Sequence, residues 1–128
     1  SKDYDFIRVN FPNGDMIGHT GVFDAVVESM EAVDRCVQTL IDEVEKANGI
    51  VVVLADHGNA DQMFKLKDGE EIPVTSHTLN PVPFCILGAD YPLADLENAG
   101  LANVAATLCH LLGYEAPSDY EPSLIRDK

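Results

Sequence analysis

The chain has 128 residues, 46% of them hydrophobic, and its 22 Asp and Glu outnumber its 8 Lys and Arg, giving a formal net charge of −14. A chain of this length and apolar content can bury one core, so it is not a disordered acidic tail. The charge repels nucleic acid phosphates and anionic membrane surfaces. It excludes those partners and leaves cations as the expected ones.

The sequence predicts a cytoplasmic protein with reduced thiols. Its first residues lack the basic start and apolar run of a signal peptide. The longest apolar run, residues 50–55, is far shorter than the roughly 20 residues of a membrane helix. Cys36, Cys85 and Cys109 form no C-x-x-C pair and are expected in the core. Because strand-like residues follow Ser1 at once, we expect a piece of a longer protein.

The first third of the chain predicts a strand, a helix and a second strand. Apolar and polar residues alternate over 4–11, typical of a short strand that the Pro-Asn-Gly sequence at 12–14 ends. Over 22–48 apolar residues recur at steps of three and four, which indicates a long helix. Residues 50–54 are apolar on both faces, as in a central strand of a parallel sheet. This order predicts a βαβ unit.

A long excursion follows, over residues 56–81. The Asp-Gly pair at 68–69 predicts a turn between strands at 64–67 and 71–74. Another apolar strand is expected over 83–87. The excursion therefore contains a small hairpin, and long loops of this kind are often functional.

The last predicted element is a helix over about 101–112, which Gly113 ends. The chain contains no internal repeat and no low-complexity linker. We therefore expect residues 1–128 to form a single α/β domain, with a mostly parallel sheet flanked by helices.

Three of the four histidines stand among small and polar residues beside predicted strands. His19 follows Asp15 by four residues, His57 follows Asp56 directly, and His77 lies in a Thr-Ser-His-Thr sequence. Ligands of an open parallel sheet bind beyond the carboxyl ends of its strands, so we expect the two Asp–His pairs to converge. Carboxylates and imidazoles without a nearby thiol favour Mn²⁺ first, then Zn²⁺, Co²⁺ or Mg²⁺.

Each cluster alone also has a simpler interpretation. An Asp-x-x-x-His pair occurs by chance as a capping or surface pair, and an Asp-His pair at a strand end can satisfy loop backbone groups. Three such clusters in one small chain favour the metal site. His110, inside the last predicted helix with no carboxylate within four residues, is given no role.

Three motifs of the chain occur together in one known family: NFPNGDMIGHTG, VVVLADHGNADQM and TSHTLNPVPF. They resemble the C-terminal part of the cofactor-independent (2,3-bisphosphoglycerate-independent) phosphoglycerate mutases of the alkaline phosphatase superfamily. The resemblance continues through LANVAATLCHLLGYEAPSDYEPSLI and so covers nearly the whole chain. It implies that residues 1–128 are the C-terminal portion of a larger, three-layer, alkaline-phosphatase-like metal-binding domain.

The resemblance also implies a role for each motif residue. Asp15, His19 and His77 would bind one Mn²⁺, and Asp56 and His57 would help to bind a second. Such enzymes interconvert 3-phosphoglycerate and 2-phosphoglycerate through a phosphoserine intermediate, in glycolysis and gluconeogenesis. The family's nucleophilic serine, and an aspartate near its N-terminus, have no counterpart here. No catalytic residue is therefore assigned within the chain.

The shortage of positive charge agrees with that absence. Phosphoryl transfer needs cationic groups around the phosphate, yet the arginines are only Arg8, Arg35 and Arg126, scattered and mostly far from the histidines. The family's arginine-rich substrate domain is missing too. We therefore expect a fragment with one whole metal site and half of another, with weak, pH-dependent Mn²⁺ binding and no mutase activity. Its expected partners are phosphoglycerate, in the full-length enzyme, and the missing N-terminal part of the same protein.

Two other function classes stay open. One is a phosphatase, sulfatase-like or phosphopentomutase-like metalloenzyme of the same superfamily, because ADHGN-type strings also fit such relatives. The other is a non-catalytic interaction module, because half of a sheet leaves apolar surface uncovered and so favours self-association.

Overall fold

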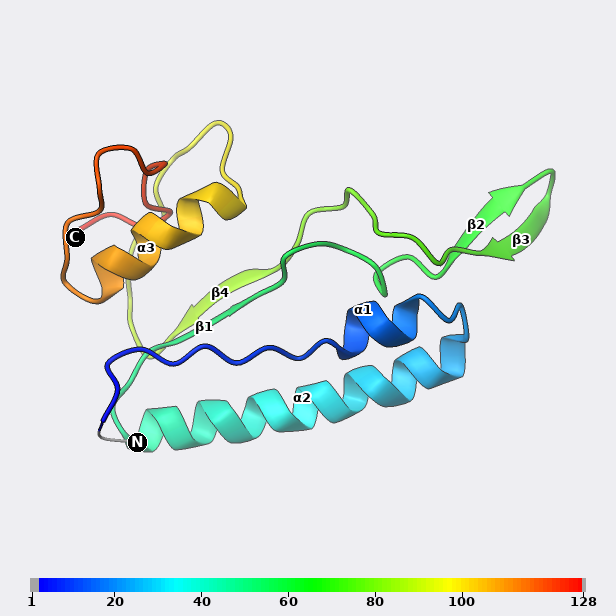
Figure 1. Cartoon of the computed structure of the whole chain (residues 1–128), viewed down its shortest axis with the longest axis horizontal. Helices are drawn as coiled ribbons and strands as arrows, with labels where there is room; N and C mark the ends of the chain where they lie inside the picture. Colours follow the sequence, from blue (N-terminus) through cyan, green and yellow to red (C-terminus); the bar gives the residue numbers. More distant parts are fainter. Residues whose placement is uncertain (1–2, 128) are drawn as a thin grey trace. The chain divides into compact units, whose positions relative to one another are not determined.

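The computed structural model describes residues 3–127, which fall into two compact units. The larger unit comprises residues 8–88, and the smaller combines 89–127 with 3–7. Figure 1 traces the elements of both, and each unit is considered by itself below.

Two helices open the larger unit. The short helix α1 (Asn13–Gly18) lies alongside the first part of α2 (Phe23–Lys46), as Figure 1 shows. Asn13 Nδ2 donates a hydrogen bond to Ser29 Oγ at 3.3 Å. Helix α2 confirms the helix predicted over 22–48. It ends where Asn48 adopts a φ of 54° and the following backbone N–H of Gly49 donates back to the Val44 carbonyl.

The strand predicted over 4–11 is wrong. These residues belong to no strand, because no described segment offers them a ladder of hydrogen bonds. Alternation alone cannot supply that partner, and Tyr4, Phe6 and Val9 are at least half exposed. Asp15, expected in a loop after a strand, lies within α1 instead, and His19 caps that helix.

The predicted parallel sheet, and with it the βαβ unit, is not seen among the described residues. Strand β1 (Val51–Leu54) pairs antiparallel with β4 (Phe84–Leu87), Val51 lying opposite Leu87. The segment between these strands contains no crossover helix. It leaves and returns at the same end of the pair, so β4 must run antiparallel to β1. The described residues form a mixed α/β structure with two small antiparallel sheets.

The predicted hairpin is confirmed. Strands β2 (Phe64–Lys67) and β3 (Glu70–Pro73) pair antiparallel around a two-residue turn. Both turn residues, Asp68 and Gly69, have positive φ, at 54° and 87°, which matches the right-handed twist of the flanking strands.

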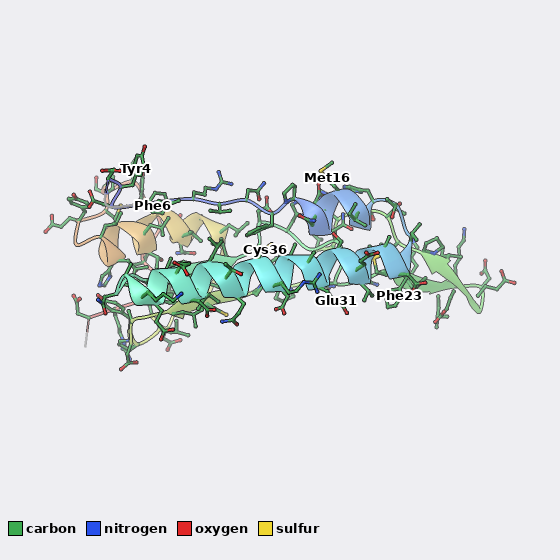
Figure 2. The ribbon with its side chains drawn as sticks, turned by 90° about the horizontal axis from the view of Figure 1, so that it is seen from below. Tyr4, Phe6, Met16, Phe23, Glu31 and Cys36 are labelled. Carbon is green, nitrogen blue, oxygen red and sulfur yellow. The ribbon has the colours of Figure 1, made fainter. Side chains whose placement is uncertain are left out.

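The described part of the chain buries few apolar side chains. Val26, Met63 and Val74 are buried in the larger unit. Cys36 and Cys85 are exposed, so the expectation of core thiols is wrong for both. Figure 2 looks onto α2, where Cys36 and Glu31 are labelled. Apolar surface on this unit is left uncovered, including the side chains of Val27, Met30, Leu54 and Leu87.

The smaller unit is built on one helix. The turn η1 (Leu101–Asn103) leads into α3 (Val104–Leu111), which confirms the helix predicted over 101–112. Thr107 is fully buried; its hydroxyl donates to the Asn103 carbonyl at 2.8 Å and accepts the backbone N–H of Leu124. No described helix has both the length and the hydropathy of a membrane span.

His110 of α3 has a partner that sequence spacing did not reveal. Its Nε2 lies 3.1 Å from Asp127 Oδ1, a carboxylate 17 residues further along the chain. Its ring also meets Tyr91 edge to face, with centroids 5.5 Å apart. Through these two contacts, His110 holds α3 against other segments of the smaller unit.

Candidate metal centre

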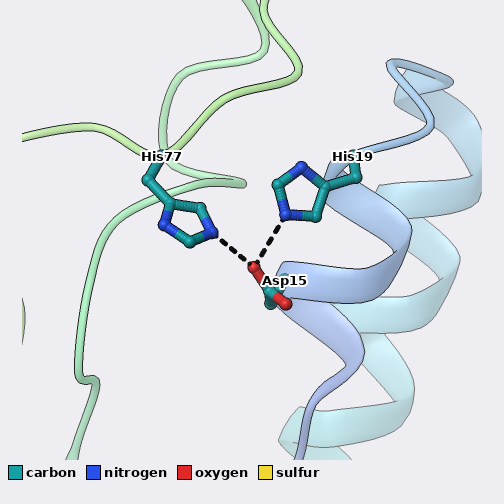
Figure 3. A group of neighbouring side chains, drawn as sticks. All are labelled: Asp15, His19 and His77. Carbon is teal, nitrogen blue, oxygen red and sulfur yellow. Dashed lines mark hydrogen bonds and ion pairs between the residues drawn. The ribbon is translucent and has the colours of Figure 1, made fainter.

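Three predicted ligands converge in the larger unit. Asp15 Oδ1 lies 3.0 Å from His19 Nε2 and 2.8 Å from His77 Nε2. One ligand atom from each residue lies within 4.8 Å of the other two. Figure 3 shows both imidazoles turned toward the same carboxylate. The three donor atoms could therefore share one cation.

Local structure explains how α1 contributes two of these side chains. Residues four apart lie on the same face of a helix, so Asp15 and His19 are neighbours, and the backbone N–H of His19 donates to the Asp15 carbonyl. His19 Nδ1 lies 2.6 Å from the Thr75 carbonyl. A carbonyl can only accept, so Nδ1 carries the proton and Nε2 is the nitrogen that faces Asp15. This bond also joins α1 to the loop that carries His77.

The predicted pair Asp56 and His57 lies beside this group. His57 Nε2 is 3.8 Å from Asp15 Oδ1 and 3.7 Å from Asp56 Oδ1. Its ring stacks on that of His77, with centroids 3.8 Å apart and planes 17° apart. The Asp56 side chain is 84% exposed. The structure thus brings all five predicted residues into one region, although α1 and two loops achieve this rather than parallel strand ends.

The surrounding imidazoles favour the ionised form of Asp15. The hydrogen bond from His77 is the main cause that lowers the pKa of this carboxyl, and the charges of His19, His77 and His57 lower it further. Partial burial opposes these effects. Asp15 is therefore a carboxylate, ready to bind a cation, at any pH near neutral.

Asn59 is a neighbour of the centre that the sequence analysis missed. It is 5% exposed, and its Nδ2 lies 3.5 Å from both the backbone oxygen and Oδ1 of Asp15. Its own Oδ1 is buried with no hydrogen-bond partner among the described residues. A Cβ at position 18 would overlap that oxygen, so Gly18 makes room for Asn59. Asn59 lies only two residues after His57, and this short spacing was the one hint in the sequence that it belongs near the metal centre. The sequence does not show that its side chain is buried.

Asp61 was also missed. Its Oδ2 accepts a hydrogen bond from Asn80 Nδ2 at 2.6 Å and one from Thr78 Oγ1 at 3.0 Å. The bond from Asn80 is the main cause that lowers the pKa of Asp61, the bond from Thr78 lowers it further, and partial burial opposes both. Only the spacing in the ADHGNAD sequence could have drawn attention to this carboxylate.

We expect Asn80→Ala to raise the pKa of Asp61 toward its ordinary value of 3.8. A pKa that is lower in the folded than in the unfolded chain stabilises the fold above the unfolded pKa, and this contribution is lost as pH falls through the folded pKa. Carbon-13 NMR titration of the Asp61 carboxyl measures its titration midpoint in the folded original chain and in the folded variant. Identical midpoints in the variant and the original chain would contradict the assignment of Asn80 as the main cause.

Comparison with known proteins places the chain in a family. Its sequence matches the metalloenzyme superfamily over residues 1–116. It is 50% identical to the 2,3-bisphosphoglycerate-independent phosphoglycerate mutase of Trypanosoma brucei brucei, over 98% of this chain and 25% of that protein. It is 52% identical to a probable 2,3-bisphosphoglycerate-independent phosphoglycerate mutase of Leptospira interrogans, over 97% of this chain and 25% of that protein.

A solved structure agrees with these relatives. The fold matches a crystal structure of Leishmania mexicana phosphoglycerate mutase at low cobalt concentration, with a TM-score of 0.90 and 48% identity. The match covers 98% of this chain and 25% of that one, so the chain spans about a quarter of the length of its relatives. The chain belongs to the metalloenzyme superfamily, and it corresponds to a segment of the 2,3-bisphosphoglycerate-independent phosphoglycerate mutases.

Proposed function

We propose that this chain supplies metal-binding side chains of a phosphoglycerate mutase that interconverts 3-phosphoglycerate and 2-phosphoglycerate through a phosphoserine. In this proposal Asp15, His19 and His77 bind one Mn²⁺, and Asp56 and His57 contribute to a second. The observation that carries the proposal is the convergence of Asp15, His19 and His77, in a chain about half identical to such mutases.

The geometry of His19 fits a cation. With its proton on Nδ1 and donated to Thr75, the Nε2 of a neutral His19 presents a lone pair to the Asp15 carboxylate only 3.0 Å away. Two acceptors face one another there, and a cation between them removes that conflict. The set of one carboxylate and two imidazoles suits Mn²⁺, Zn²⁺ or Co²⁺ better than a soft metal.

The chain's own part in the reaction would be to hold and orient charge. A bound divalent cation neutralises phosphate oxygens and lowers the pKa of a nucleophilic hydroxyl. Asp15 contributes the negative charge, the Thr75 carbonyl fixes the tautomer of His19, and Asn59 lies against the backbone and side chain of Asp15. The serine nucleophile and the cationic groups for the substrate would come from outside residues 1–128.

The same proposal covers partners and location. We propose that residues 1–128 form one part of an alkaline-phosphatase-like metal-binding domain and that their partner is the rest of the same protein. Exposed apolar side chains on α2, β1 and β4 support a covering partner, and without it they favour association of two copies.

The net charge of −14 argues against nucleic acid and membrane partners. Free thiols at all three cysteines support a cytoplasmic protein.

Calorimetric titration with Mn²⁺ at about pH 7.5 and about pH 5.5 tests the proposed ligands. Imidazoles must be neutral to bind a metal and ordinarily change charge between about pH 5 and 8, so we expect affinity to fall about 10- to 100-fold at the lower pH. Asp15 contributes little to this change because its pKa lies below its ordinary value. Equal affinity at both pH values would indicate binding by carboxylates alone and would contradict the proposal.

A further inference from the structure

Two loops bring His57 and His77 together, and they are joined immediately next to the two rings. Gly58 follows His57 and Thr78 follows His77. The backbone N–H of Thr78 donates to the Gly58 carbonyl at 2.9 Å, and the two residues form an isolated antiparallel bridge. A single backbone hydrogen bond fixes the two loops at one point, and a second tie between them would hold the stacked rings in place.

Asp61 provides that tie. Its Oδ1 and Oδ2 lie 3.2 and 3.0 Å from Thr78 Oγ1, and Oδ2 also accepts the amide of Asn80 at 2.6 Å. The carboxylate therefore binds the loop of His77 at two residues just after that histidine. Bonds to a charged acceptor are stronger than those between neutral groups. Asp61 is not a member of the close group formed by Asp15, His19 and His77.

Gly58 lets the two loops come this close. A Cβ there would lie 2.6 Å from Asp61 Oδ1 and would overlap Thr78 Oγ1. Gly58 is also buried, although Asp61 itself is exposed. The bridge and the carboxylate network thus require the absence of a side chain at the residue that follows His57.

We propose that Asp61 is a positioning residue of the metal centre: its carboxylate fixes the loop of His77 against the loop of His57, so that His77 Nε2 stays directed at Asp15. The inference rests on the proposed metal site, since it assigns Asp61 a role in metal affinity. Residues that orient metal ligands typically change affinity about 10- to 100-fold when they are replaced.

The test compares Asp61→Ala with Asp42→Ala in the full 128-residue chain. Asp42 is a matched control, because it also accepts a side-chain amide, from Gln38 at 2.7 Å, and its loss removes the same charge. We expect Asp61→Ala to weaken Mn²⁺ binding about tenfold in calorimetry, and Asp42→Ala to leave it unchanged. Titrations are run well below the melting temperature of each variant.

A second readout needs no metal. The rings of His57 and His77, with centroids 3.8 Å apart, should give a nuclear Overhauser effect between them. We expect this signal to be lost in Asp61→Ala and kept in Asp42→Ala. Thr78→Ser keeps the hydroxyl and should keep both the signal and the affinity, whereas Thr78→Val should weaken both. If Asp61→Ala does not fold, Asn80→Ala removes the donor of the shortest bond and is measured in its place.

The outcomes separate this inference from the proposed function. If Asp61→Ala keeps both the ring signal and the Mn²⁺ affinity while His77→Ala loses affinity, the positioning role is wrong and the metal site stands. If His77→Ala itself leaves the affinity unchanged, the metal site is wrong as well. A lower melting temperature with unchanged affinity would assign Asp61 to stability alone, which also overturns the inference.

Discussion

Replacing His19 and His77 together with alanine is expected to reduce the Mn²⁺ affinity of the chain at least about 100-fold at neutral pH. The two imidazoles meet at one oxygen of Asp15, at 3.0 and 2.8 Å, and their loss leaves Asp15 as the one remaining ligand of that proposed site. A single carboxylate holds a divalent ion only weakly. Isothermal titration calorimetry of the original chain and the double variant measures the difference.

His110→Ala is the matched control for this prediction. Its imidazole also lies beside one carboxylate oxygen, that of Asp127 at 3.1 Å, but among the described residues no second imidazole pairs with that oxygen. We expect this variant to keep the affinity of the original chain. Unchanged affinity in the double variant, or an equal loss in His110→Ala, would show that the ligands are assigned wrongly.

The second large effect is expected on catalysis, in a chimeric enzyme. The 128-residue chain alone should show no mutase activity. When it replaces the matching 25% of the Trypanosoma brucei brucei relative, we expect conversion of 3-phosphoglycerate to 2-phosphoglycerate. Asp15→Asn in this chimera should lower kcat at least about 10³-fold, because a metal that supplies about 4 kcal/mol of charge stabilisation is no longer held.

Asp42→Asn is the control in the chimera, since it makes the same chemical change on α2, outside the metal centre. A coupled assay of 2-phosphoglycerate formation, with a check that each chimera is folded, gives the comparison. Full activity of the chimera carrying Asp15→Asn would remove Asp15 from the reaction. Efficient conversion by the purified chain alone would contradict the proposal that the serine nucleophile and the substrate-binding groups come from outside residues 1–128.

Local signals in the sequence predicted most elements correctly but not the way in which they pair. The helix periodicity of α2, its stop at Asn48 and Gly49, and the Asp68–Gly69 hairpin depend on neighbouring residues, so short patterns identify them. Strand pairing depends on a partner distant in the sequence. The alternation over 4–11 therefore suggested a strand that has no described partner, and the apolar run of β1 suggested a parallel sheet where β4 returns antiparallel.

The same distinction applies to the metal centre. The spacing of Asp15 and His19 indicated that these two side chains would be neighbours, and they are, although they meet as i and i+4 positions of a helix rather than in a loop. The bond from His19 to the Thr75 carbonyl spans 56 residues, and the network around Asp61 spans up to 19. No pattern within a single motif encodes these contacts. They became visible only when the loops were placed against each other.

Anomalous X-ray diffraction from a crystal of the chain grown with Mn²⁺ tests the central claim most directly. We predict a manganese peak about 2 Å from each of Asp15 Oδ1, His19 Nε2 and His77 Nε2, with His19 Nδ1 still donating to the Thr75 carbonyl. A manganese peak elsewhere, with His19 Nε2 and His77 Nε2 still in direct contact with Asp15 and no ion between them, would contradict the metal centre.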